Sequence, residues 1–225
     1  MSLKGTTRTL VICGAFGMAL VVACGISLFA GAVRVPFGMM FDSPIIRMRL
    51  ARILLAVVAG TGLSVAGAIF QAILRNPLAD PYVLGVSSGA GLGVATAIIL
   101  GAAVIGPWML PGAAFGGALV TILLVYVLAR TAAGGVPIHT LLLSGVIVSA
   151  VLGSILMFLV SMAPSENLHS VVWWLLGNLQ VFDWALLRVV AVVVAAGTAV
   201  CVLLARDLNL MTLGEEPAAH MGLHV

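Results

Sequence analysis

The stretch Arg75-Asn-Pro-Leu-Ala-Asp-Pro-Tyr-Val-Leu-Gly-Val-Ser-Ser-Gly-Ala-Gly91 holds two prolines, two charged side chains and three glycines in a chain that is otherwise apolar over long distances. A residue that precedes proline is disfavoured in the α-helical conformation, so Pro77 predicts that the helix before it ends at or before Asn76. Asp80 followed by Pro81 has the form of a helix N-cap with proline at the first helical position, which predicts a short turn.

The end of the same stretch predicts the start of another helix. Gly85 permits a second reversal of the chain, because glycine adopts left-handed conformations without a steric penalty. Ser87 or Ser88 can then cap the new helix, and Gly89 lets its first turns pack very close to a neighbour. The residues therefore predict a compact, internally hydrogen-bonded re-entrant segment between two spans, and leave open whether it is a well-made loop or a functional element.

The composition predicts a membrane protein. Hydrophobic residues make up 63% of the chain and charged residues 8%, against about 45–50% and about 25% in soluble domains, and the mean hydropathy is +1.28. A membrane-spanning helix needs about 20 apolar residues, and the first window here is too long for the apolar region of a signal peptide. We expect an all-α, polytopic bundle with six spans: Leu10–Val33, Ile53–Leu74, Val86–Leu110, Gly112–Ala129, Leu141–Met162 and Trp184–Ala205.

The charge pattern excludes some partners and leaves one feature unexplained. The formal net charge is +3, but the basic residues stand singly except for Arg47, Arg49 and Arg52, so no nucleic-acid surface is predicted. If the N-terminus is cytoplasmic, five basic residues fall on each side, and the positive-inside rule does not decide the orientation. The arginine cluster then lies on the outer side, where it faces lipid headgroups or receives carboxylates from a partner protein.

Catalytic and metal-binding patterns are missing from the sequence. The seven acidic residues all fall in predicted loops or at span ends, whereas ion-coupled carriers usually bury an ionisable group near the membrane midplane. The three cysteines lie singly in apolar runs, and the histidines lie at loops or ends. We therefore expect no catalytic residue, no metal and no cofactor, and a source of energy outside this chain.

Small residues and tryptophans indicate how the spans pack. Pairs of small residues four positions apart predict close helix contacts in lipid, where association depends on close packing: Gly62 and Ala66, Gly85 and Gly89, Gly89 and Gly93, Gly112 and Gly116. The break at Ala163–Ser170 leads into Trp173 and Trp174, with Trp184 further on. Anchoring at the membrane interface is the favoured interpretation of these tryptophans, and a ligand-stacking platform is the alternative.

Residues 50–90 resemble the permease subunits of iron-siderophore, haem and cobalamin ABC importers, the FecCD type. The matching order is an arginine-rich start, Ala66-Gly-x-x-x-Gln71, Asn76-Pro-Leu-Ala-x-Pro81 and Leu84-Gly-x-x-x-Gly-Ala90. The resemblance marks the following residues as family scaffold: Gln71, Asn76, Pro77, Asp80, Pro81, Gly85 and Gly89.

Two further segments resemble the same family. Trp174-Leu-Leu-Gly-Asn178 is similar to a Trp-x-x-Gly-Ser segment, with asparagine in place of serine. Residues 213–223 are similar to the cytoplasmic coupling segment Leu-Gly-x-x-x-Ala-x-x-Leu-Gly, with methionine in place of its second leucine. We expect this segment, within 207–225, to dock as short helices on an ATPase through Gly214, Glu215, Glu216, Ala218, Met221 and Gly222.

The resemblance implies a multi-pass permease of about ten spans in a bacterial or archaeal cell (inner) membrane. Its implied partners are two ABC ATPase subunits, a periplasmic or lipid-anchored substrate-binding protein and a second permease copy. Arg49 and Arg52 match outer arginines that receive acidic side chains of the binding protein, Arg47 assists them, and Ala51 replaces the proline common between them.

The sequence departs from the family in length. Family members continue with further spans, so we expect this chain to be a fragment or a truncated gene product that forms no complete pathway alone. The leading functional hypothesis is an ATP-driven transport subunit that hydrolyses nothing itself. The alternative is a secondary carrier or channel that works without an ATPase.

Overall fold

The computed structural model describes residues 3–31, 33, 43–133, 137–179 and 183–222. Every regular element in these ranges is helical, which confirms the all-α fold class. The order is α1 (Leu3–Phe29), α2 (Pro44–Leu74), a 3-10 turn η2 (Pro81–Leu84), α3 (Val86–Ile99), a 3-10 turn η3 (Ala102–Ile105), α4 (Met109–Ala133), α5 (Ile138–Met162), α6 (Ser165–Leu175), α7 (Trp184–Leu203), α8 (Ala205–Met211) and α9 (Glu215–His220).

Five of the described helices, α1, α2, α4, α5 and α7, are long and apolar enough to cross a membrane. The predicted third span is wrong at its end, because α3 stops at Ile99 after 14 residues instead of reaching Leu110. Gly101 adopts φ 71° there, and the chain continues as η3. A helix of 14 residues is about 21 Å long, less than the hydrocarbon thickness of about 30 Å. The described residues therefore form five helices of spanning length, and α3 is a shorter apolar helix.

Four of the described helices, α1, α2, α4 and α5, begin earlier than their apolar windows. Helix α2 starts at Pro44, where proline is accepted at the first helical position, and not at Ile53. Its 31 residues are about 46 Å long, and the arginine cluster lies within its first turns. Helix α4 starts at Met109, so Pro111 lies in its first turn instead of between two predicted spans.

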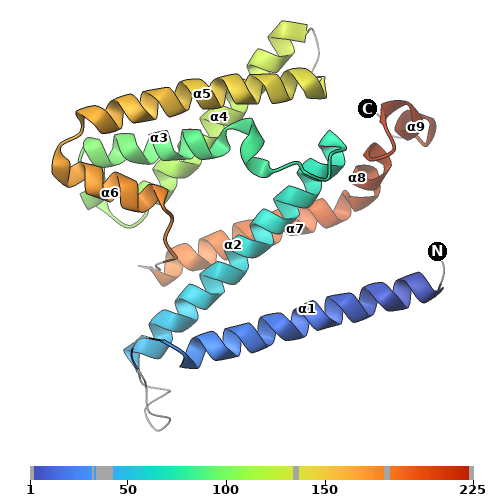
Figure 1. The fold of residues 1–225 in the computed structure, drawn as a ribbon, viewed down its shortest axis with the longest axis horizontal. Helices are drawn as coiled ribbons and strands as arrows, with labels where there is room; N and C mark the ends of the chain where they lie inside the picture. The colour runs from blue at the N-terminus through green and yellow to red at the C-terminus, as the bar shows by residue number, and fades with distance from the viewer. Residues whose placement is uncertain (1–2, 32, 34–42, 134–136, 180–182, 223–225) are drawn as a thin grey trace.

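The described helices form two groups joined through α2 and η2. Figure 1 shows α3, α4, α5 and α6 packed together, whereas α7 runs beside α2 and α1 lies against the start of α2. The main core lies in the first group, where Val94, Ala95 and Ile98 of α3 meet Leu156 of α5 and Val171 of α6. Residues 165–175, which the sequence leaves in a break between spans, form helix α6 in this group.

Helices α3 and α4 approach more closely than any ordinary side chain would permit. A Cβ atom on Gly89 would lie 2.7 Å from the Gly117 carbonyl oxygen, and one on Gly93 would overlap the Ala113 carbonyl oxygen. The prediction for Gly89 and Gly93 is confirmed. A Cβ atom on Gly112 or Gly116 would meet nothing within 4 Å among the described residues, so this pair does not form the contact. The contacting residues of α4 are their neighbours, Ala113 and Gly117.

Candidate functional site

The re-entrant segment folds largely as its local sequence predicts. Helix α2 ends at Leu74, and Arg75 caps it in the left-handed conformation with φ 51°. The Asn76 side-chain oxygen accepts a hydrogen bond of 2.9 Å from the Leu78 backbone N–H. The Asp80 carboxylate accepts one of 2.8 Å from the Tyr82 backbone N–H, which confirms its role as an N-cap. Asn76 and Asp80 therefore stabilise the two turns that reverse the chain.

The helix after these turns begins differently from the prediction. Gly85, at φ 76°, ends η2 and is also the N-cap of α3, with no side-chain cap on this helix. Ser87 and Ser88 are already inside the first turn of α3, so the prediction that one of them caps the helix is wrong. The left-handed conformation of Gly85 lets η2 and α3 follow each other directly, and glycine adopts this conformation without strain.

The re-entrant segment reaches into the first helix group. Ala79 and Leu84 are buried, and a Cβ atom on Gly85 would overlap the hydroxyl oxygen of Ser149. Ser149 lies about 17 Å along α5 from its first residue, at 1.5 Å per residue. Within a membrane, backbone that is not helical is tolerated where other parts of the protein surround it. The segment thus compensates for the shortness of α3.

The three arginines of α2 do not share one environment. Arg47 and Arg52 are exposed, whereas Arg49 is half-buried. The Arg49 guanidinium donates to backbone carbonyls at the end of α1: from Nη1 to Leu28 at 3.0 Å and Phe29 at 3.2 Å, and from Nη2 to Val33 at 2.6 Å. Sequence patterns assign the arginines to one surface, and the structure separates one of them from the other two.

The segment that resembles a coupling element consists of α8 and α9. Gly214, at φ 109°, joins the two helices, and Gly222, at φ 87°, follows α9. Ala218 is fully buried, whereas Met221 is exposed. Glu215 and Glu216 begin α9, and their side chains lie outside the described part of the structure.

This segment is in contact with the end of α2. Helix α8 packs against α2, and a Cβ atom on Gly214 would lie 3.3 Å from Nη1 of Arg75. Figure 1 shows α8, α9 and the C-terminal end of α2 at one end of the molecule, with the start of α2 and the end of α1 at the other. We call these the coupling end and the arginine end.

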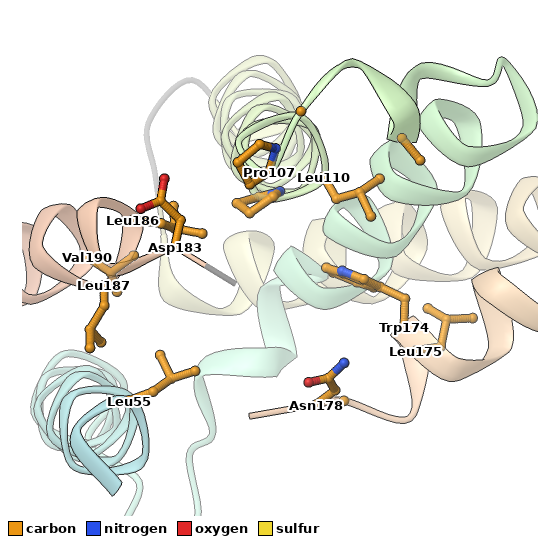
Figure 2. A pocket seen from close by; sticks show the side chains of 14 residues that line it. Leu55, Pro107, Leu110, Trp174, Leu175, Asn178, Asp183, Leu186, Leu187 and Val190 are labelled. Atoms are coloured by element: carbon orange, nitrogen blue, oxygen red, sulfur yellow. The ribbon is translucent and has the colours of Figure 1, made fainter. Parts of the chain in front are cut away.

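An apolar cavity of about 520 Å³ opens at the arginine end. Figure 2 shows Leu55 of α2, Trp174 of α6 and Leu187 of α7 around it, with Pro107 from the turn before α4. Leu55 is three residues, or about one helical turn, after Arg52, so the wall of the cavity begins about one turn along α2 from this exposed arginine. Its volume lies within the range of about 300–1,000 Å³ that is usual for small-molecule sites.

Two polar side chains line this cavity. They are Asn178, which follows α6, and Asp183, which caps α7 by accepting a 2.7 Å hydrogen bond from the Ala185 backbone N–H. Trp174 also packs against the α3 core cluster, while Trp173 and Trp184 stay exposed. The cavity wall therefore contains one of the three tryptophans. Within the described ranges, no three His, Cys, Asp or Glu side chains come together as a metal site.

Comparison with known proteins agrees with this geometry. Residues 19–225 match the FecCD transport family. The chain belongs to this family. One FecCD-type relative, the cobalamin import system permease protein BtuC of Halobacterium salinarum, is 41% identical over 179 residues, which are 79% of this chain and 47% of that protein.

A second relative, the hemin transport system permease protein HmuU of Yersinia pestis, is 35% identical over 189 residues, which are 80% of this chain and 54% of that protein. A solved structure described as an inward-facing conformation of a metal-chelate type ABC transporter superposes with a TM-score of 0.80 at 28% identity. The superposition covers 93% of this chain and 65% of the solved one. The chain spans about half the length of the two curated FecCD relatives.

Several contact residues of these sites cannot be paired with their partners from the sequence. Gly117 and Thr121 of α4 face Gly89, Ser149 of α5 faces Gly85, and Gly31 faces Arg49. A small residue at each of these positions is a weak sign of close approach, but its partner lies on another element. Such contacts become visible only when the helices are placed in space.

Proposed function

We propose that this chain is a permease subunit of an ATP-driven importer for iron-siderophore, haem or cobalamin-type chelates in a bacterial or archaeal cell membrane. The match of residues 19–225 to the FecCD transport family carries the proposal. ATP hydrolysis takes place on a separate ABC ATPase, and a substrate-binding protein delivers the chelate. A second permease copy completes the pathway across the bilayer.

Helix α2 supports this proposal, because it joins the two ends at which such partners bind. Its first turns carry the exposed Arg47 and Arg52, and its last residue precedes Arg75, which lies beside Gly214 of the coupling segment. A continuous helix resists bending over its length of about 46 Å. When a partner displaces one end of α2, the whole helix therefore shifts and the other end moves with it.

In the coupling segment, the buried and exposed residues take different roles. Ala218 is enclosed by this chain and holds α9 in position, whereas Met221 is exposed and is available to an ATPase groove. We expect Met221→Asp to weaken copurification of the ABC ATPase, because a carboxylate would have to be desolvated in the contact. Leu204→Asp, on an exposed residue outside the segment, is the control and should leave the ATPase bound.

At the arginine end, the two exposed arginines bind carboxylates of the substrate-binding protein, and the adjoining cavity is the first surface that the chelate meets. The double substitution Arg47→Glu with Arg52→Glu should weaken docking in a salt-dependent manner, because like charges then face each other. Docking that is unchanged at low salt would refute this assignment.

Transport itself is tested with vesicles that contain the permease, its ABC ATPase and its binding protein. Uptake of a ferric hydroxamate siderophore, haemin and cyanocobalamin is measured with and without ATP inside. We expect one of these probes to accumulate only with ATP. Accumulation that persists without ATP and without the ATPase would replace the proposal with a secondary carrier or channel.

A further inference from the structure

The C-terminal end of α1 is held by one side chain of α2. Arg49 donates hydrogen bonds to the carbonyl oxygens of Leu28, Phe29 and Val33, the first two in the last turn of α1 and the third beyond it. Carbonyl groups in the last turn of a helix have no partner within the helix. A cation at this position also interacts favourably with the negative end of the helix dipole.

The chain beyond α1 is shaped around this guanidinium. A Cβ atom on Gly31 would overlap Nη2 of Arg49 and would lie 2.7 Å from its Cζ atom. Any other residue at position 31 would therefore displace the arginine or the chain. Gly31 and Arg49 are two independent features of the sequence, and together they form one closely fitted contact.

Helix α1 has little other attachment to the described part of the molecule. Most of its described side chains are exposed, and a Cβ atom on Gly14, Gly17 or Gly25 would meet nothing within 4 Å. Figure 1 shows α1 meeting α2 at the arginine end and diverging from it toward the N-terminus. Lipid surrounds exposed apolar side chains as well as a neighbouring helix does, so burial alone does not hold α1 in place.

We propose that Arg49 is a positioning residue, a clamp that fixes the end of α1 to the first turns of α2. The guanidinium presents its donors in a planar fork that reaches several carbonyls, which the single ammonium group of lysine cannot match. Arg47 and Arg52 remain as the exposed cations of the arginine end. The clamp concerns this chain alone and does not depend on the proposed transport function.

The position of α1 can be measured by electron paramagnetic resonance on the full-length protein in lipid vesicles. Spin labels are attached to the native Cys13 of α1 and Cys201 of α7, after Cys24→Ser removes the remaining cysteine. We expect a single narrow distance distribution in the parent protein. Arg49→Ala should broaden it, because the end of α1 then loses its bonds to α2.

Gly31→Val is the second test, since it displaces the guanidinium while all three arginines keep their charge. We expect the same broadening as in Arg49→Ala. Arg52→Ala is the matched control, because it removes an exposed arginine one turn further along α2, and it should keep the narrow distribution. Unchanged distributions in Arg49→Ala and Gly31→Val, or equal broadening in Arg52→Ala, would overturn the clamp.

A reference pair separates this effect from misfolding. Labels at Leu123→Cys on α4 and Phe158→Cys on α5, both exposed in the first helix group, report whether that group stays intact in a background without native cysteines. If Arg49→Ala alters this pair as well, Arg49→Lys decides the question. A broadened α1 to α7 distance with an intact reference pair supports the clamp, and a narrow α1 to α7 distance refutes it.

Discussion

The contact between α3 and α4 predicts opposite effects for alanine at two adjacent glycines of α4. A Cβ atom on Gly117 would overlap the Gly89 carbonyl oxygen, and would lie 3.0 Å from the Gly89 carbonyl carbon and 3.4 Å from the Gly93 Cα atom. These are backbone atoms, which cannot rotate away, so the helices must move apart. A Cβ atom on Gly116 would meet nothing within 4 Å.

The magnitude follows from two terms. Overpacking of this kind costs about 1–3 kcal/mol of unfolding free energy. Replacement of glycine by alanine inside a helix contributes about 1 kcal/mol in the opposite direction, through the lower entropy of the unfolded chain. Both variants gain the second term, but only Gly117→Ala has the first. We therefore expect Gly117→Ala to be less stable than Gly116→Ala by about 1–3 kcal/mol.

Unfolding in mixed micelles with increasing sodium dodecyl sulfate, followed by tryptophan fluorescence and circular dichroism, measures this difference. The two variants are matched, since they lie next to each other on one helix and introduce the same methyl group. Gly89→Ala should reproduce the loss from the opposite side of the contact, where its Cβ atom would meet Thr121. Equal free energies of unfolding for Gly116→Ala and Gly117→Ala would refute the close approach of α3 and α4.

Two further predictions concern the re-entrant segment. Gly85→Ala and Gly101→Ala both place a side chain at a positive φ, but of these two glycines only Gly85 faces another residue, through the Ser149 hydroxyl. In the same titration, Gly85→Ala should therefore lower the unfolding free energy more than Gly101→Ala does. Equal losses would contradict the insertion of the re-entrant segment against α5. Asp80→Ala removes the acceptor for the Tyr82 N–H and should reduce the unfolding free energy by about 0.5–2 kcal/mol. Asp80→Asn keeps an acceptor and should reduce the unfolding free energy less. Equal reductions in both variants would exclude the cap.

The turns of the re-entrant segment were predictable because their causes are local. Proline acts on the residue before it, and a capping carboxylate acts on a backbone N–H two residues away. The end of α2 before Pro77 and the cap at Asp80 both follow from such short-range effects. Hydropathy likewise identified five long spans, because a window of about 20 apolar residues has few alternatives to a membrane helix.

The boundaries of α2 and α3 were mispredicted for a related reason. Hydropathy begins a span where polar side chains stop, but arginine is a good helix former, and α2 includes its arginine cluster. Between Val86 and Leu110 the residues stay apolar, so hydropathy does not register the reversal at Gly101. The change from helix to turn depends on the backbone conformation, whereas a hydropathy window measures only the polarity of the side chains.

The sequence by itself determined the fold class, the family motifs and the turns whose capping groups lie within a few residues of each other. Only the tertiary structure decided which small residues touch, and which arginine is bound to backbone carbonyls of this chain. Arg49 bonds to carbonyls 16 to 21 residues earlier in the chain, and Gly117 faces Gly89 across two helices. Such contacts depend on the rotation and approach of whole helices, which in lipid are set by the fit between surfaces and not by the burial of apolar residues.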